Sequence, residues 1–326
     1  MNLQYTDPPE AGKDYPRNWS EFLDWFASEE ACLTYLEQLR WPAGFACPSC
    51  GAIGEPYRSS RARLMCRGCA HQSTVTAGTI FDKTRTPLRV WLAAAWYLTN
   101  QKHGVSALGL QRVLGLGGYE TAWTMLHRFR RAMVRPDRDL LKGVVEVDET
   151  YLSITDRHAP IATDQRRRRK NQTDQVVVAI AVELAQPKGF GRIRLRRVDN
   201  DSAEQVVPFV QANVATGSRV RTDGSAAYRT LGDLGYDHER RVMLGASEPA
   251  HVSLAGVHRV AALIKRWILG THHGSVQPTH LDAYLDEFVF RFNRRSSASR
   301  GMLFFRLIQQ AVHTSPVTYQ AVVGYQ

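Results

Sequence analysis

The pattern of hydrophobic and polar residues changes near residue 143, where a helical first part gives way to a second part rich in strands. In the first part, apolar residues recur at the three- and four-residue spacing of amphipathic helices. The spacing predicts helical segments at 18–40, 87–102 and 105–133. Ser20 and Ser28 are the expected N-caps of two short helices within the first of these segments.

After residue 143, runs of β-branched residues replace the helical spacing. The predicted strands are 144–152, 174–184, 191–199, 218–224 and 239–244. The predicted helices are 202–214, 225–235, 257–270 and 279–295. Three strands in succession, followed by alternating helices and strands, indicate an α/β fold with a mixed sheet flanked by helices.

Four of the five cysteines form two C-x-x-C pairs separated by fifteen residues, Cys47 with Cys50 and Cys66 with Cys69. This spacing is typical of a tetrahedral four-cysteine zinc site. Disulfides are the alternative, but they are rare in chains that stay in a reducing compartment. Because four sulfurs leave no open coordination position, we expect this zinc to be structural and to hold together a ribbon at about 41–78.

The charge of the chain is strongly positive, with 42 Lys and Arg against 31 Asp and Glu and a net charge of +11. Such a balance suits a polyanion, and nucleic acid is the first candidate; simple solubility charge is the alternative. The N-terminus does not resemble a secretory signal, and no apolar run reaches the ~18–20 residues of a membrane span. We therefore expect a cytoplasmic, nucleoid-associated protein with no membrane partner.

The segment 105–133 contains two predicted helices joined by a glycine-rich turn at 114–118. The second helix ends in a basic group formed by Arg128, Arg130 and Arg131. This arrangement is typical of a DNA-binding helix-turn-helix, although helical hairpins also occur as ordinary packing units. If it does bind DNA, these arginines are the expected phosphate contacts.

A polar segment at 155–174 interrupts the first two predicted strands. It contains an unbroken basic run of Arg166, Arg167, Arg168, Arg169 and Lys170. A charge run of this kind is either a solvated loop tip or a contact with the DNA backbone. The sequence leaves the two interpretations equal.

Two aspartates lie in or at the end of predicted strands. Asp148 lies in the valine-rich strand 144–152, and Asp223 ends the strand 218–224. Either alone could be a turn residue, but two carboxylates held close together repel unless they bind a divalent cation. Mg²⁺ or Mn²⁺ at such a pair can activate a water or hydroxyl and stabilise the leaving oxygen of a phosphodiester.

Two further residues complete the predicted site. His258 and Lys265 are seven apart on a predicted helix, so they share one face and could act as a metal ligand and a phosphate contact. Strand alternation puts Glu146 on the face of Asp148, where it could tune that carboxylate, and turns Glu149 to the other face in a structural role.

Taken together, CPSC…CRGC, VEVDETYL, VRTDG, VHRVAALIKRWILGTHHG and YLDEFVFRFNRR resemble the bacterial insertion-sequence transposases with an N-terminal zinc ribbon and a DDE-type catalytic domain. The resemblance is to the ISXO-like branch of the IS1595 family and runs from about residue 20 to 310. It implies an RNase H-like catalytic domain that cuts and rejoins DNA with two divalent metal ions.

Asp148 and Asp223 match the first two catalytic acids of the family, and Lys265 matches its lysine. His258 falls on the third catalytic position, where many relatives carry Glu or Asn. This departure favours Mn²⁺ over Mg²⁺, because imidazole is a softer and less anionic ligand than carboxylate. Glu287 is a weaker candidate for a substitute acid.

The expected domains are an N-terminal helical segment (1–40), the ribbon (41–78), a helix-turn-helix-like region (79–140), the catalytic domain (141–312) and a tail (313–326). The expected function is DNA transposition, with terminal inverted repeats and target DNA as partners and a homodimer acting on the DNA. The alternatives are a catalytically impaired DNA-binding regulator and a stand-alone structure-specific nuclease.

Overall fold

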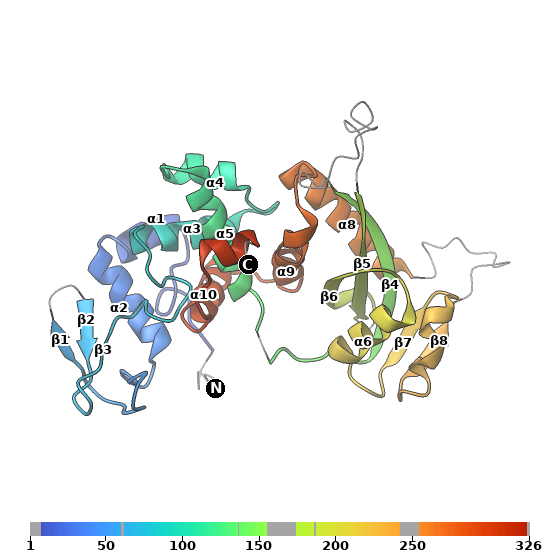
Figure 1. Cartoon of the computed structure of the whole chain (residues 1–326), viewed down its shortest axis with the longest axis horizontal. Coiled ribbons are helices and arrows are strands. Elements are labelled where there is room, and N and C mark those ends of the chain that lie inside the picture. Colours follow the sequence, from blue (N-terminus) through green and yellow to red (C-terminus); the bar gives the residue numbers. More distant parts are fainter. Residues whose placement is uncertain are drawn as a thin grey trace. The chain divides into compact units, whose positions relative to one another are not determined.

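The chain forms two compact units (Figure 1). Unit 1 comprises Met1–Arg135 and Ser296–Gln326, and unit 2 comprises Pro136–Arg295. The computed structural model describes residues 8–59, 62–135, 137–154, 174–185, 187–241 and 254–324. No helix in these described ranges is long and apolar enough to cross a membrane.

Unit 1 consists of helices around an aromatic core, with a small three-stranded sheet. Its helices are α1 (Trp19–Trp25), α2 (Glu29–Arg40), α3 (Leu88–Asn100), α4 (Ala107–Leu114), α5 (Tyr119–Ala132), α10 (Arg300–Ala311) and α11 (Tyr319–Val323). Its strands are β1 (Tyr57–Ser59), β2 (Arg63–Met65) and β3 (Gln72–Ser73), paired antiparallel in that order.

The helix caps partly follow the sequence prediction. Ser28 caps α2 by accepting a hydrogen bond from Ala31 N at 3.2 Å, as expected. The cap of α1 is Asn18, whose Oδ1 accepts from Glu21 N at 3.0 Å, and Ser20 lies inside the helix. Asn is as good an N-cap as Ser, so spacing alone could not choose between the two positions.

The core of unit 1 draws α10 from the far end of the chain. Phe304 packs its ring against Phe22, Phe26 and Trp96. A side chain at Gly301 would lie 2.1 Å from the Pro16 carbonyl oxygen, so only glycine allows this close approach. Helix α10, which the sequence grouped with the strand-rich part, therefore belongs to the compact body of unit 1.

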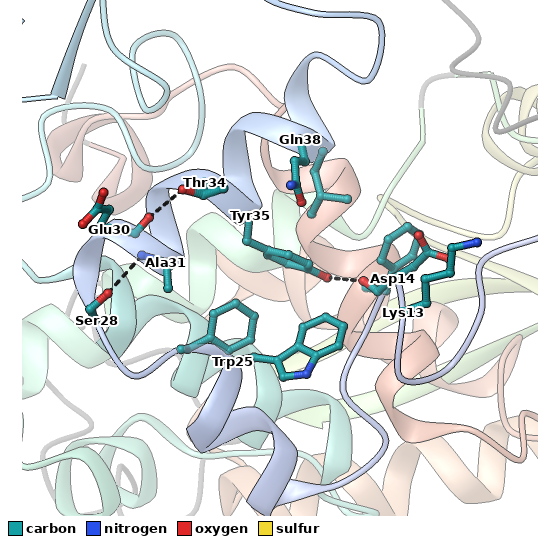
Figure 2. A pocket seen from close by; sticks show the side chains of 12 residues that line it. Lys13, Asp14, Trp25, Ser28, Glu30, Ala31, Thr34, Tyr35 and Gln38 are labelled. Atoms are coloured by element: carbon teal, nitrogen blue, oxygen red, sulfur yellow. Dashed lines mark hydrogen bonds between the residues drawn. The ribbon is translucent and has the colours of Figure 1, made fainter. Parts of the chain in front are cut away.

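A cavity of about 530 Å³ opens on unit 1 (Figure 2). It is bordered by Trp25 at the end of α1, by one face of α2 and by the loop residues Lys13 and Asp14. The Tyr35 hydroxyl closes one wall by donating to the Asp14 carbonyl oxygen at 3.1 Å. The cavity contains none of the residues predicted to bind metal or DNA.

Unit 2 is built on a five-stranded mixed sheet in the order β6-β5-β4-β7-β8. The strands are β4 (Val144–Ile154), β5 (Asp174–Leu184), β6 (Phe190–Val198), β7 (Arg219–Thr222) and β8 (Asp237–Arg240). The first three pair antiparallel, whereas β7 pairs parallel with β4 and β8 parallel with β7. This is the RNase H-like arrangement, and the predicted fold class is confirmed.

Helices cover both faces of this sheet. They are α6 (Ala203–Asn213), η3 (Ala226–Leu231), α8 (Ala255–His272), η4 (Pro278–His280) and α9 (Leu281–Phe292). Val145 and Val147 of β4 pack in a core with α6 and η3, while Leu152 and Ile154 pack with α8 and α9. Strand β4 therefore lies in the middle of a three-layer unit, with its even-numbered positions on the side of α8.

Two predicted elements differ from the observed ones. The predicted helix 225–235 is a short 3₁₀ helix, Ala226–Leu231, since Gly232 and Gly235 follow and disfavour a longer helix. The predicted strand 239–244 is observed as Asp237–Arg240, and residues 242–253 lie outside the described part of the chain.

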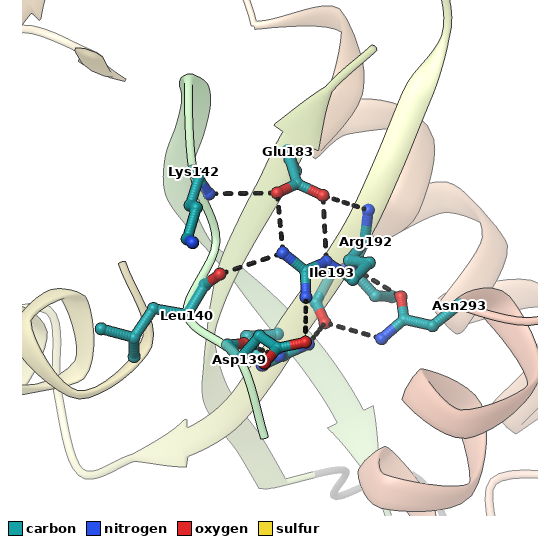
Figure 3. A network of polar contacts seen from close by, with 8 residues as sticks. Asp139, Leu140, Lys142, Glu183, Arg192, Ile193 and Asn293 are labelled. Carbon is teal, nitrogen blue, oxygen red and sulfur yellow. Dashed lines mark hydrogen bonds and ion pairs between the residues drawn. The ribbon is translucent and has the colours of Figure 1, made fainter. Parts of the chain in front are cut away.

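A polar network ties the β5–β6 hairpin to the segment entering β4 (Figure 3). The Glu183 carboxylate accepts four hydrogen bonds, one from Lys142 N and three from the backbone and guanidinium of Arg192. Arg192 also donates to the Leu140 carbonyl oxygen at 3.0 Å. Although burial opposes it, the hydrogen bonding with Arg192 and Lys142 holds the pKa of Glu183 below its ordinary value.

We expect Glu183→Ala to destabilise unit 2 by about 2 kcal/mol, because the variant leaves partly buried donors without their charged acceptor. Hydrogen exchange of the β5 and β6 amides measures the opening of this unit separately from unit 1. The control is Asp237→Ala, which removes an exposed ion pair with Arg219 in the same sheet and should change little. Equal protection in both variants would contradict the prediction.

Candidate metal and nucleic-acid sites

Asp148 lies in β4, and Asp223 directly follows the neighbouring parallel strand β7. The register pairs Val144 with Arg219 and Glu146 with Arg221. Continuing this register by two residues along both strands brings Asp148 level with Asp223. The sheet thus places side by side the two carboxylates that the sequence predicted to act together.

The loop that carries Asp223 is held by its own hydrogen bonds. Asp223 Oδ1 accepts from Ser225 N at 2.9 Å, and the buried Thr222 hydroxyl donates to the Asp223 carbonyl oxygen at 3.0 Å. Arg240 of β8 donates to the Gly224 carbonyl oxygen at 3.0 Å. Asp223 therefore has a defined position just beyond the end of β7.

Asp148 is partly buried and electrostatically strained. Burial and, to a smaller extent, the nearby Asp223 charge raise the pKa of its carboxyl to about 6. The Glu149 N–H, which donates to Asp148 Oδ1 at 2.9 Å, and the charge of His258 act in the opposite direction. A carboxyl group whose ionised form is disfavoured by burial and by a second carboxylate nearby fits the surroundings of a bound cation.

His258 lies in the first turns of α8 and interacts electrostatically with both Asp148 and Glu146. Its Nε2 is buried and has no hydrogen-bond partner among the described residues. A buried ring nitrogen that lacks a hydrogen-bond partner among the described residues and lies near carboxylates fits a metal ligand. Lys265, also on α8, is exposed.

These donors fit a divalent cation in chemical type, since oxygen ligands suit Mg²⁺ and an imidazole adds affinity for Mn²⁺. The side chains are not gathered tightly. Within the described ranges, the only group of three or more metal-ligating side chains whose ligand atoms all lie within 4.8 Å is the cysteine group. Asp148, Asp223 and His258 would have to converge on a shared ion.

Glu149 makes a contact that the sequence did not predict. It lies on the opposite face of β4 from Asp148, as expected, and accepts a hydrogen bond from the buried Tyr228 hydroxyl of η3. Burial raises the pKa of Glu149 to about 7, partly offset by this hydrogen bond. The pair links the strand of Asp148 to the segment after Asp223; the only sequence signal was a tyrosine five residues beyond that aspartate.

The position of Glu287 does not fit a substitute third metal ligand. It is completely buried in α9, and its Oε1 accepts a hydrogen bond from Arg291 Nε at 2.9 Å. A carboxylate already paired with a guanidinium inside the core is a structural group.

The four predicted zinc ligands come together in unit 1. Their sulfurs lie within 4.8 Å of one another, with Cys47 Sγ 3.6 Å from Cys69 Sγ and Cys50 Sγ 3.7 Å from Cys66 Sγ. These separations are far longer than a disulfide bond and close to the ~3.8 Å between sulfurs of a tetrahedral zinc site. The donor set and its geometry fit structural zinc.

The ribbon has little else to stabilise it. Its buried cluster consists of Phe45, Leu64 and two of the cysteines, with Trp41 packed against them. So small a core cannot offset the entropy of ordering the segment, so zinc must supply much of its stability.

We expect Cys66→Ser to lose the bound zinc and unfold the ribbon, as measured by metal analysis and limited proteolysis of the full chain. The control is Cys32→Ala. Cys32 is buried in α2 and is not one of the four cysteines whose sulfurs gather, so its variant should keep the metal. Full zinc content in Cys66→Ser would contradict the assignment.

The predicted helix-turn-helix is observed as α4 and α5, with Gly115 in the left-handed conformation at the end of α4. Its three arginines differ in exposure. Arg130 is only 1% exposed, and the Arg128 guanidinium donates to the carbonyl oxygens of Ile80 and Asp82. These two therefore do not fit the predicted phosphate contacts, because their positive groups face the protein interior; Arg131 is exposed and fits.

The basic run Arg166–Lys170 lies outside the described residues. Its predicted contact with the DNA backbone remains a prediction.

Comparison with known families matches both units. Residues 140–293 match the ISXO2-like transposase domain, and residues 27–72 match the transposase zinc-ribbon domain. The first match contains Asp148, Asp223, His258 and Lys265, and the second contains all four cysteines of the two C-x-x-C pairs.

Individual proteins show the same relationship. The chain is 28% identical over 294 residues to a protein of Halobacterium salinarum described as an uncharacterized protein in transposable element ISH50, covering 82% of this chain and 91% of that protein. Among solved structures, the Mos1 transposase paired-end complex with left transposon end has a TM-score of 0.27 at 14% identity, covering 68% and 75% of the two chains. A pre-cleavage Mos1 transpososome scores 0.25 at 13% identity, covering 72% and 78%. These structural scores are too low to add to the assignment. The two domain matches and the ISH50 relative show that the chain belongs to the IS1595 family of insertion-sequence transposases.

Proposed function

We propose that this transposase binds the terminal inverted repeats of its element and catalyses metal-dependent DNA cleavage and strand transfer. The observation that carries the proposal is the parallel register of β4 and β7, which continued by two residues aligns Asp148 with Asp223, and the electrostatic interaction of both Asp223 and His258 with Asp148. The family membership supports the same conclusion.

Asp148, Asp223 and His258 are the residues that would hold Mg²⁺ or Mn²⁺. When bound, such ions activate a water or DNA 3′-hydroxyl and stabilise the leaving 3′-oxygen in an in-line displacement. The chain's own contribution is to orient the ligands, by the strand register for the two aspartates and by α8 for the histidine. The exposed Lys265 would contact a phosphate oxygen of the bound strand.

DNA binding is proposed for the remainder of the chain. The net charge of +11 supports a polyanionic partner. The ribbon and the α4–α5 pair are the proposed readers of the repeats, with Arg131 as a phosphate contact. Because transposition joins two ends, a homodimer assembled on DNA is the expected active form.

His258 at the third position supports a second candidate, a DNA-binding regulator with an impaired metal site. The discriminating test uses DNA carrying the sequences that flank this gene, incubated with the full chain in Mg²⁺ and in Mn²⁺. Metal-dependent nicking and joining at the repeat ends would support the transposase; specific binding without nicking would support the regulator. Nicking of scrambled DNA at the same rate would instead indicate a structure-specific nuclease.

A further inference from the structure

We propose that Glu146 is a positioning residue that anchors the N-terminus of α8 to β4 and thereby sets His258 beside Asp148. The inference rests on the proposed function of these two residues as metal ligands. In this role Glu146 holds a helix in position, whereas the sequence suggested only that it could tune the Asp148 carboxylate.

The contacts of Glu146 are those of a helix cap supplied by a strand. Its side chain is 4% exposed, and its Oε2 accepts hydrogen bonds from Gly256 N at 2.7 Å and Val257 N at 3.2 Å. The first N–H groups of a helix have no partner within the helix, and the helix dipole favours an anion there. Among the described residues, no side chain of the N-cap position caps α8, because Leu254 stands there.

The backbone of α8 approaches the sheet closely at this point. A side chain at Gly256 would place its Cβ 2.8 Å from Glu146 Oε2 and 3.2 Å from Val182 Cγ1. Glycine is therefore required for the carboxylate to reach the amides. His258 follows Gly256 by two residues, so a displacement of this turn moves the imidazole directly.

A direct metal-ligand role is the alternative for Glu146, because it shares the face of Asp148 and could supply the acid that His258 replaces. The hydrogen bonds favour positioning. A single oxygen accepts both N–H groups, so the amide oxygen of glutamine can replace it, whereas a ligand to a divalent cation needs the negative charge. Substitutions of Glu146 can therefore test the effect of side-chain length separately from the effect of its negative charge.

The test measures Mn²⁺ binding to the full chain by electron paramagnetic resonance, together with Mn²⁺-dependent cleavage of repeat-bearing DNA. We expect Glu146→Gln to bind Mn²⁺ nearly as well as the wild type. Glu146→Asp keeps the charge but is one methylene too short, and like Glu146→Ala it should weaken binding about 10- to 100-fold, the range typical of lost ligand orientation.

A second pair of variants tests the same geometry from the helix. Gly256→Ala should weaken Mn²⁺ binding as Glu146→Ala does. Gly270→Ala, in the same helix but with open space around the added Cβ, should leave it unchanged.

The opposite ranking, with Glu146→Asp active and Glu146→Gln inactive, would overturn positioning in favour of a metal-ligand role. Wild-type binding in every Glu146 variant would overturn both roles. If the wild type itself shows no Mn²⁺ binding that depends on Asp148, the proposed function fails and this inference fails with it, an outcome distinct from the other two.

Discussion

Asp148→Asn is expected to lose more than about 100-fold of metal-dependent cleavage, because loss of a ligand must exceed the 10- to 100-fold cost of disturbing a residue behind it. Asparagine has nearly the same shape, so β4 and the core around Val147 are preserved. What disappears is the negative charge that we propose acts with Asp223 to hold a cation. Cleavage of end-bearing DNA in Mg²⁺ and Mn²⁺ measures the effect.

The same variant should bind repeat DNA as tightly as the wild type in a mobility-shift experiment, since DNA binding is proposed for other parts of the chain. Asp237→Asn provides the matched control, as it removes an exposed carboxylate in the same sheet that pairs with Arg219. Cleavage retained by Asp148→Asn, or lost equally by Asp237→Asn, would exclude Asp148 as a metal ligand.

The second large effect on cleavage is expected from substitutions of His258. His258→Ala should also lose more than about 100-fold of cleavage, because it removes the third ligand and leaves only two carboxylates. His258→Glu should remain active and shift its preference from Mn²⁺ towards Mg²⁺, since a carboxylate is a harder and more anionic ligand than imidazole.

The readout is the ratio of cleavage rates in the two metals for each His258 variant. An unchanged ratio in His258→Glu would show that this side chain does not contact the metal. Full activity of His258→Ala would remove this residue from the proposed site.

Local patterns were sufficient for the parts of the protein whose physics is local. The C-x-x-C spacing predicted the cysteine group because each pair spans a single tight turn. Valines on alternate positions predicted β4, and the same alternation correctly sorted Glu146 and Glu149 onto opposite faces. The succession of strands also predicted the mixed sheet, because strands that follow one another in the chain commonly pair as neighbours in a sheet.

Exposure was harder to predict than secondary structure. Arg128, Arg130 and Arg131 are near neighbours on one helix and look alike in sequence, yet two of them turn inward. Which arginine faces solvent depends on what packs against α5, and nothing within the helix itself reveals this. For the same reason Glu287 could be weighed as a catalytic acid until its burial and its pairing with Arg291 were known.

The sequence was enough to name the residues of the proposed metal site, since an aspartate at a strand end and a histidine with a lysine two helical turns later are recognisable locally. Only the tertiary structure brought them together. When the parallel register of β4 and β7 is continued by two residues, Asp148 lies level with Asp223, which follows it by 75 positions in the chain. The Glu146 carboxylate accepts a hydrogen bond from Gly256 of α8, which is more than a hundred residues away in the chain. Such contacts depend on how distant elements pack, because their energy comes from burial and hydrogen bonding between segments and not from the preferences of either segment alone.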